Sequence, residues 1–202
     1  ILAAFAESIR AMAEGEVLQL TRSFDPELTE STYLEVIGGK TSSLLAAASE
    51  AGAILGGVTR SERRAVREDG WLLGLAFQLV DDALDYSGSE RDLGKAPLTD
   101  VAEGKLTLPL IATLKRCSTG ERDAISSLLK DFALQSAAGR SPDRESVQRV
   151  AECVERHRGV ESTLARAQLL GSQARSQIEP FVDCEAKHAM LALADFVVGR
   201  QS

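Results

Sequence analysis

Aromatic residues, histidines and cysteines are scarce in this 202-residue sequence, and basic residues are outnumbered by acidic ones. Aromatic residues make up 4% of the chain, and there are two histidines. The three cysteines, Cys117, Cys153 and Cys184, are far apart and form no C-x-x-C pair, so a zinc site or a disulfide framework is not expected. Lys and Arg number 23 against 30 Asp and Glu, and the net charge of -7 disfavours nucleic acid and anionic membranes as partners.

Long hydrophobic runs are also missing. No stretch approaches the roughly 20 apolar residues that a membrane-spanning helix needs, and no basic segment followed by an apolar core opens the chain. A cytoplasmic protein without a transmembrane segment is therefore predicted. The chain starts with residues 1–5 (ILAAF), without an initiator Met and in the middle of a helical pattern, so we expect an N-terminal portion to precede it.

Hydrophobic residues, by contrast, make up 44% of the sequence and charged residues 26%, which is the composition of an ordinary folded protein. The apolar residues are mostly Ala and Leu, which favour helices. The sequence predicts an all-α fold in a single domain, residues 1–202, that is incomplete at its N-terminus. Apolar spacing and capping residues predict helices at about residues 1–21, 29–55, 61–86, 107–116, 121–134, 142–158, 160–178 and 183–202, with a break at Gly38-Gly39 and an irregular segment at 88–104.

One predicted helix carries polar residues in a regular pattern. Between residues 75 and 86 almost every residue is apolar except Gln78, Asp81, Asp82 and Asp85. These four lie at positions i, i+3, i+4 and i+7, which is one face of a helix. Because the remaining faces are apolar, the helix should be buried, and its acidic face should line an internal cavity.

Three carboxylates on one buried face repel one another. Two of them about 4 Å apart repel by roughly 4 kcal/mol at an effective dielectric constant of about 20, so a divalent cation that neutralises them is the simplest resolution. Oxygen ligands without His or Cys suit Mg²⁺, which keeps several waters and bridges to substrate phosphates. Asp81, Asp82 and Asp85 are thus candidate magnesium ligands. The alternative, on the residues alone, is an acidic helix face exposed to water.

A metal-bound phosphate on this face would need cations from elsewhere in the chain, and three lysines are candidates. Lys40 is the only basic residue between Arg22 and Arg60, and it has no nearby partner in the sequence. Lys95 and Lys105 flank the polar segment after the aspartates, where glycines let the backbone approach a ligand. Lysine binds phosphate well as a point charge. Each lysine taken singly also fits an ordinary surface charge.

At this point the pattern resembles a known family. Residues 77–86 (FQLVDDALDY) resemble the second aspartate-rich motif of trans-polyprenyl diphosphate synthases. Residues 39–41 resemble the lysine-threonine step of that family, residues 93–95 its later lysine, and residues 100–110 the segment that follows. The resemblance is close over residues 9–114. It implies the isoprenoid-synthase fold, an all-α helical bundle around a central cavity, here without its N-terminal helices.

The resemblance also implies a reaction and a set of site residues. An allylic prenyl diphosphate would ionise with the help of Mg²⁺, and isopentenyl diphosphate would attack the resulting cation before losing a proton. Asp81, Asp82 and Asp85 would hold Mg²⁺ directly or through water. Five polar side chains would contact the allylic diphosphate, namely Lys40, Thr41, Gln78, Lys95 and Lys105. Of these, Lys40, Gln78 and Lys95 would be catalytic, and a homodimer is the implied assembly.

Two features that the family needs are missing from this chain. The first aspartate-rich motif and the basic cluster for isopentenyl diphosphate do not occur, and both would lie N-terminal of Ile1. The 202-residue chain alone is therefore expected to be inactive. Residues 14–19 and 103–105 resemble medium- and long-chain synthases of the quinone side-chain type more than farnesyl synthases. The residues that usually set product length would also lie upstream, so the sequence determines neither product length nor allylic primer.

Three other interpretations stay open at this point. A non-catalytic or regulatory subunit of a heteromeric prenyl synthase can lack the first motif, although the intact second motif argues against this. A terpene-cyclase-like protein would carry N-D-x-x-S-x-x-x-E, which does not occur here. A plain helical interaction domain is the remaining alternative. An aspartate-rich motif upstream of Ile1 would decide for the synthase.

Overall fold

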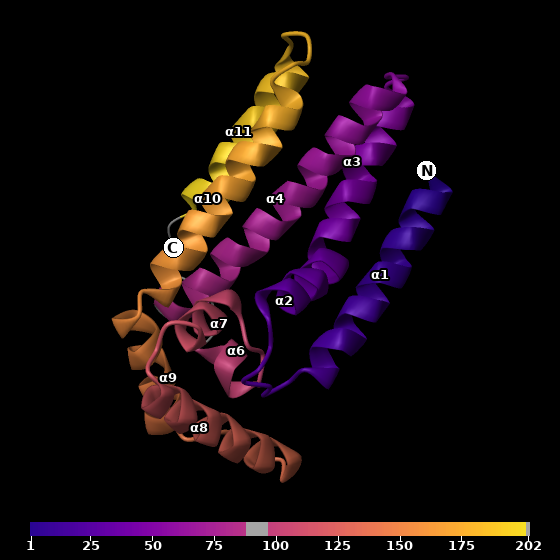
Figure 1. Cartoon of the computed structure of the whole chain (residues 1–202). Coiled ribbons are helices and arrows are strands. Elements are labelled where there is room, and N and C mark those ends of the chain that lie inside the picture. Colours follow the sequence, from indigo (N-terminus) through magenta and orange to yellow (C-terminus); the bar gives the residue numbers. More distant parts are fainter. Residues whose placement is uncertain (88–96, 201–202) are drawn as a thin grey trace. The chain divides into compact units, whose positions relative to one another are not determined.

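The computed structural model describes residues 1–87 and 97–200, and every regular element in these ranges is a helix (Figure 1). The elements are α1 (Leu2–Thr21), α2 (Glu30–Ile37), the π-helical turn η1 (Gly38–Ser42), α3 (Ser43–Leu55), α4 (Arg60–Ser87), α6 (Thr99–Ala102), α7 (Leu108–Leu114), α8 (Thr119–Ala137), α9 (Arg144–Arg156), α10 (Gly159–Ile178) and α11 (Glu185–Gly199). The prediction of an all-α fold is confirmed.

Two compact units can be distinguished within the described chain. The first unit consists of residues 1–18, 34–80 and 165–200, and the second of residues 19–33 and the described part of 81–164. The helices α1, α2, α4 and α10 each contribute residues to both units. That residues 1–202 form one domain stays a prediction.

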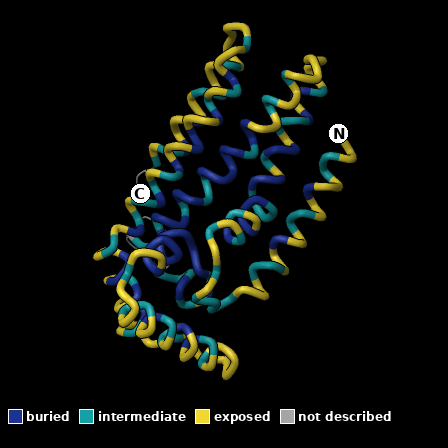
Figure 2. The backbone as a smooth tube through the Cα atoms, in the orientation of Figure 1, coloured by how far each residue is buried: buried dark blue, intermediate teal, exposed yellow. Residues whose placement is uncertain are grey.

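The core of the first unit includes the central turns of α4. Leu73, Leu75 and Leu79 are buried there, and Leu73 and Leu75, two positions apart, point to nearly opposite sides of the helix. Figure 2 shows these turns of α4 in dark blue. The prediction that the helix with the polar stripe is buried is therefore confirmed.

The two last helices, α10 and α11, lie side by side in the same unit (Figure 1). A methyl group at Gly171 of α10 would come within 2.6 Å of Val198 of α11. Arg175 Nη1 donates to Asp195 Oδ2 at 2.7 Å across the pair. A small residue and an ion pair thus fix the approach of these helices.

The turn η1 coincides with the predicted break at residues 38–39, and two helices approach it very closely. A Cβ atom at Gly39 would lie 2.7 Å from the carbonyl oxygen of Ala11 on α1. A Cβ atom at Gly74 on α4 would lie 2.5 Å from the Cα atom of Ser42. Glycine is the residue that permits such approaches, because it has no Cβ. The break therefore has a packing cause, since α1 and α4 enclose the turn.

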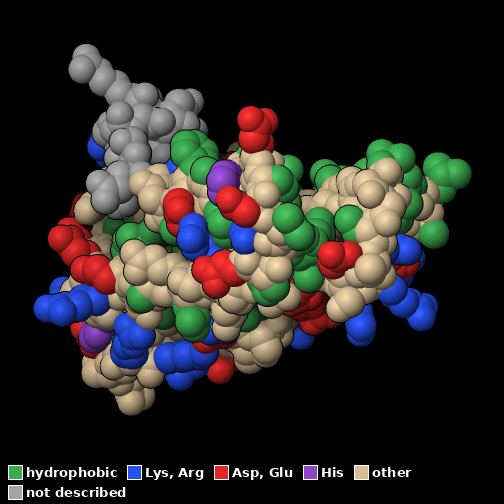
Figure 3. Space-filling model, turned by 90° about the horizontal axis from the view of Figure 1, so that it is seen from above, with side chains coloured by type: hydrophobic (Ala, Val, Ile, Leu, Met, Phe, Trp, Pro, Cys, Tyr) green, Lys and Arg blue, Asp and Glu red, His purple; other side chains and the backbone are tan. Residues whose placement is uncertain are grey.

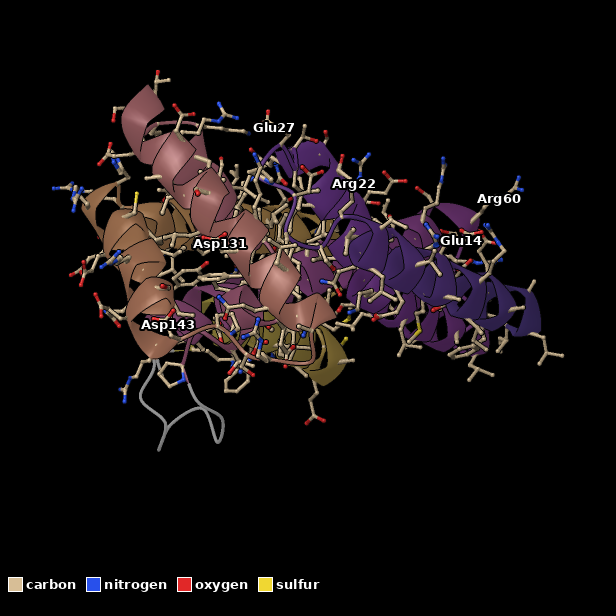
Figure 4. All side chains as sticks on the ribbon, turned by 90° about the horizontal axis from the view of Figure 1, so that it is seen from below. Glu14, Arg22, Glu27, Arg60, Asp131 and Asp143 are labelled. Atoms are coloured by element: carbon tan, nitrogen blue, oxygen red, sulfur yellow. The ribbon has the colours of Figure 1, made fainter. Side chains whose placement is uncertain are left out.

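In the second unit α8 and α9 lie side by side, and both begin at well-formed caps (Figures 1 and 4). Ser118 and Glu121 form a capping box, in which Ser118 N donates to Glu121 Oε2 at 3.0 Å and Glu121 N donates to Ser118 Oγ at 3.3 Å. At the start of α9, Ser146 N donates to Asp143 Oδ1 at 2.9 Å. Such caps contribute about 1 kcal/mol each, and the first lets α8 begin earlier than predicted.

The short helix α6 corrects one prediction. Residues 88–104 are predicted to be irregular, but the described part of this segment contains the four-residue α6. Leu98 N donates to the carbonyl oxygen of Asp85 at 2.9 Å, and Asp100 N donates to Asp85 Oδ2 at 3.2 Å. These bonds come from a distant helix, and a single helical turn is too short to show apolar periodicity.

The helix α1 has a buried side and an exposed apolar side. Ser8 and Gly15 are buried, whereas Leu2, Ile9 and Val17 are 87%, 65% and 60% exposed. Hydrophobic side chains also reach the face of the molecule in Figure 3, interspersed with acidic and basic ones. Among the described residues, no helix combines the length and the hydropathy that a membrane span requires.

The close contact between α1 and η1 can be tested with alanine substitutions. Gly39→Ala is expected to destabilise the protein by about 1–3 kcal/mol, because the new methyl group meets main-chain atoms of α1 that cannot rotate away. Gly52→Ala on α3 is the matched control, since nothing lies within 4 Å of a Cβ atom there. Thermal unfolding followed by circular dichroism would measure both. Equal melting temperatures for the two variants would contradict this account of the turn.

Candidate functional site

The predicted polar face lies on α4, which continues without interruption to Ser87 and therefore keeps the predicted spacing. Asp82 is 3% exposed and Asp85 0%, while Gln78 and Asp81 are half-buried. Two carboxylates are thus almost completely removed from water. Carboxylates buried to this degree require hydrogen-bond donors or cations close to them.

A tyrosine of α2 donates to Asp82. The hydroxyl group of the buried Tyr33 donates to Asp82 Oδ2. Burial raises the pKa of Tyr33 well above its usual value, and the negative charges of Asp82 and Asp100 raise it further. The hydroxyl group therefore keeps its proton and remains a donor. Tyr33 is absent from the residues predicted by sequence, because 49 positions separate it from Asp82.

Asp85 connects the acidic face with α6. Its Oδ2 accepts a hydrogen bond of 3.2 Å from the main-chain nitrogen of Asp100, which fixes the orientation of the Asp85 carboxylate. The charge of Asp100 also contributes to the raised pKa of Tyr33, so this carboxylate lies close to the same group. Asp100 is therefore a fourth acidic residue of the cluster. The sequence indicated it only as the first residue of the segment that resembles the family.

Lys105 lies beside this cluster. Its Nζ is 2.6 Å from Glu103 Oε2 and 3.6 Å from Asp100 Oδ1. The preceding Gly104 has a φ of +82°, and a Cβ atom there would overlap the ring of Phe24. The main-chain nitrogen of Phe24 donates to the carbonyl oxygen of Gly104 at 2.9 Å. This turn, which only glycine fits, holds Lys105 next to Asp100.

In the first unit, Thr41 of η1 and Gln78 of α4 are joined by a hydrogen bond. Thr41 Oγ1 donates to Gln78 Oε1 at 3.1 Å. The amide group accepts with its oxygen here, so its nitrogen is the end that can donate to an anion. A π-helical turn inside a helix is often found at functional sites, and here it places Thr41 at hydrogen-bond distance from Gln78.

Lys40 has a partner that the sequence did not indicate. It is predicted to have no structural partner, but its Nζ lies 2.7 Å from Glu16 Oε2 of α1. Both side chains are partly exposed, so the ion pair contributes no more than about 1 kcal/mol. Glu16 belongs to the segment of residues 14–19 that resembles the family. That resemblance was the one available signal for Glu16.

Within each unit, the predicted site residues are grouped by the contacts that they make. Lys95 lies outside the described residues. The first unit contains two contacting pairs, Lys40 with Glu16 and Thr41 with Gln78. The second unit brings together five residues, namely Tyr33, Asp82, Asp85, Asp100 and Lys105. Asp81 lies on the same face of α4 as Asp85, one turn before it.

The donor set of the acidic face suits a hard divalent cation. Asp81, Asp82 and Asp85 offer carboxylate oxygens, which Mg²⁺ prefers over softer ligands. Tyr33 donates a hydrogen bond but carries no positive charge, so it does not neutralise Asp82. Asp81 is the most exposed of the three carboxylates and hence the one best placed to face a metal-bound ligand. The residues present therefore fit a magnesium site.

Comparison with known proteins identifies relatives over nearly the whole chain. The family model described as polyprenyl synthetase matches residues 1–140. An octaprenyl diphosphate synthase of Haemophilus influenzae is 36% identical over 200 residues, which are 99% of this chain and 58% of that protein. A short chain isoprenyl diphosphate synthase of Methanothermobacter thermautotrophicus is 35% identical over 200 residues, with the same coverage of 99% and 58%.

A solved structure agrees with the sequence comparison. The polyprenyl synthase from Caulobacter crescentus, complexed with calcium and isoprenyl diphosphate, superposes with a TM-score of 0.89 at 38% identity, over 100% of this chain and 59% of that one. The chain thus spans less than two thirds of the length of the relatives it matches. The predicted fold class is confirmed, and the family model and the relatives together show that the chain belongs to the polyprenyl synthetase family.

Proposed function

We propose that this protein is a polyprenyl diphosphate synthase, a prenyltransferase that lengthens an allylic prenyl diphosphate with isopentenyl diphosphate. The observation that carries the proposal is the acidic face of α4, with Asp82 and Asp85 buried, in a chain of the polyprenyl synthetase family. The relatives reported above are prenyl diphosphate synthases. Because the chain covers 58% of their length, the proposal concerns the protein of which this chain is a part.

In the proposed reaction, the carbon–oxygen bond of the allylic diphosphate breaks, and both electrons of that bond leave with the diphosphate. The double bond of isopentenyl diphosphate then forms the new carbon–carbon bond, and loss of a proton restores a double bond. Bound Mg²⁺ would neutralise the negative charge of the departing diphosphate. Asp81, Asp82 and Asp85 would hold this ion, directly or through water.

Lys40, Thr41 and Gln78 would bind the allylic diphosphate. Donors that are already in place stabilise the charge that develops on a leaving group. The Thr41–Gln78 hydrogen bond of 3.1 Å orders two of these side chains without a ligand. The ion pair with Glu16 is too weak to withhold Lys40 from a highly charged ligand. Lys95 and Lys105 complete the proposed set.

Replacing Asp81 should remove one of the carboxylates that are proposed to hold Mg²⁺. In the complete protein, Asp81→Ala is expected to lower kcat by roughly 10²- to 10³-fold while the helical circular dichroism signal stays unchanged. Asp131→Ala is the matched control, because it removes the same charge from an exposed position on α8 (Figure 4). Product formation from radiolabelled isopentenyl diphosphate would measure both. Activity that is unaffected by EDTA would contradict the proposed metal site.

The role of Lys40 can be separated from its ion pair. Lys40→Ala is expected to raise the KM for the allylic diphosphate roughly 10- to 100-fold, which corresponds to the loss of a hydrogen bond to a charged group, about 1.5–3 kcal/mol. Its melting temperature should change little, because the Lys40 ion pair is partly exposed. Glu16→Gln, which breaks the same ion pair, should leave KM close to that of the wild type.

Lys130→Ala on the exposed side of α8 provides a control for the loss of a positive charge. If Glu16→Gln raised KM as much as Lys40→Ala does, the lysine would act through α1 rather than on the substrate. Unfolding of Lys40→Ala with unchanged substrate affinity would make the residue structural.

The proposal extends to assembly, location and product. We place the enzyme in the cytoplasm as a homodimer, with the exposed apolar side of α1 at the dimer interface. Leu2, Ile9 and Val17 lie about two helical turns apart along α1 and are mostly exposed. The similarity of residues 14–19 to medium- and long-chain synthases supports a product of that type. A protein that is active only with a second, different subunit would favour the regulatory alternative.

The dimer interface can be tested with a single charge. Ile9→Glu is expected to convert the dimer into a monomer, because the interface would have to bury an unpaired carboxylate. Leu134→Glu, which replaces an exposed leucine on α8, should leave the dimer intact. Sedimentation velocity would distinguish the two states. A wild-type protein that is monomeric, or an Ile9→Glu variant that stays dimeric, would contradict this assignment.

A further inference from the structure

A second group of metal-ligating side chains lies in the second unit, where α8 begins and α9 ends. Glu121 is in the first turn of α8, Cys153 is in the last turn of α9, and His157 is the C-cap of that helix. One ligand atom from each of the three lies within 4.8 Å of the other two. His157 Nε2 is 3.2 Å from Glu121 Oε2. Cys153 and His157 are four positions apart and therefore share one side of α9.

A second thiol, that of Cys117, lies near this group but is not one of its three members. Cys117 directly precedes Ser118, the N-cap of α8, and its thiol is free and half-buried. Burial raises the pKa of Cys153, and the nearby Cys117 and Glu121 raise it further. Burial and the charge of Glu121 likewise raise the pKa of Cys117. The ligand atoms that lie within 4.8 Å of one another are those of Glu121, Cys153 and His157, and these three residues form the cluster.

The chemistry of the cluster favours metal binding over a reactive thiol. A nucleophilic or redox-sensing cysteine has a lowered pKa, whereas the pKa values of Cys117 and Cys153 are both raised. Hydrogen bonds from Ser118, followed by those from His157 and Arg156, lower the pKa of Glu121 to about 2, so this side chain is a carboxylate at neutral pH. A sulfur, an imidazole and a carboxylate are ligands that suit a borderline-soft divalent cation.

We propose that Cys153, His157 and Glu121, with a water as the fourth ligand, bind one Zn²⁺ ion in tetrahedral geometry and thereby clamp the start of α8 to the end of α9. At metal–ligand distances of about 2.0–2.3 Å, neighbouring ligand atoms are about 3.3–3.8 Å apart. The observed spread of at most 4.8 Å for three of the ligands closes to that size with small side-chain rotations. Binding releases the thiol proton of Cys153 to water and involves no redox change.

The surroundings of Glu121 support the site. Its Oε1 accepts from Arg156 Nη1 at 2.9 Å and its Oε2 from Ser118 N at 3.0 Å. Hydrogen bonds of this kind orient a carboxylate ligand at metal sites. The sequence predicts no zinc site, because Cys117 and Cys153 are far apart in the chain and lack C-x-x-C spacing. The fold brings Glu121 next to Cys153 and His157. The soft ligands also distinguish this site from the all-oxygen face of α4.

Cobalt is the probe that tests the site. The complete protein, without an affinity tag and with reduced thiols, is titrated with Co²⁺ in excess Mg²⁺. One equivalent is expected to give the sulfur-to-cobalt charge-transfer band in the near ultraviolet and the visible bands of tetrahedral Co²⁺. Zn²⁺ should then abolish both. Carboxylates on α4 cannot produce the sulfur band, so failure here is independent of the proposed synthase function.

Two variants and a control assign the ligands. Cys153→Ser and His157→Gln should each lose tight Co²⁺ binding, and the raised melting temperature that Zn²⁺ gives the wild type should disappear. Because His157 is half-buried, His157→Gln keeps the test valid if Cys153→Ser fails to fold. Cys184→Ser, at an exposed cysteine before α11, should bind as the wild type does. Absence of the sulfur band, its persistence in both variants, or a Cys117–Cys153 disulfide in the purified protein would overturn the proposal.

Discussion

A carboxylate that is buried loses its hydration, and the protein has to replace that hydration with donors placed at bonding distance. Asp82 and Asp85 impose this requirement on the second unit. The hydroxyl group of Tyr33 donates a hydrogen bond to Asp82, and the main-chain nitrogen of Asp100 donates one to Asp85. Main-chain nitrogens at the start of α6 donate to Asp85, and the glycine turn at Gly104 holds Lys105 beside Asp100. Much of the local structure around the acidic face follows from the burial of two charges.

The helices were predictable where residues recur at helical spacing over several turns or where the sequence contains a strong N-cap. The buried α4 shows its polar residues at helical spacing, and Ser118 with Glu121 marks the start of α8. Gly38-Gly39 signalled a break, but not that α1 and α4 would close on it at main-chain distance. The turn of α6 was missed because its stabilising bonds come from Asp85, which no local pattern reveals.

In the candidate site too, the features carried by one helix were predictable and the contacts between elements were not. The spacing of Asp81, Asp82 and Asp85 in the sequence is enough to indicate a metal, since helical geometry fixes how the three carboxylates are related. Residues that contribute from another element could not be predicted from the sequence. Tyr33 meets Asp82, and Glu16 meets Lys40, only in the folded chain. The cluster of Glu121, Cys153 and His157 was missed for the same reason, because Glu121 meets the other two only in the folded chain.

The helix α1 has consequences for how this protein can vary. On one side, Ser8 and Gly15 pack against α3 and η1, where the hydroxyl groups of Ser8 and Ser43 lie 3.3 Å apart. Next to them, Glu16 reaches Lys40, and Ile9 lies on the exposed apolar side. A substitution that enlarges the buried side tilts the helix, and the tilt moves every other side chain with it. Mutations on α1 are therefore expected to be accepted in compensating pairs rather than singly.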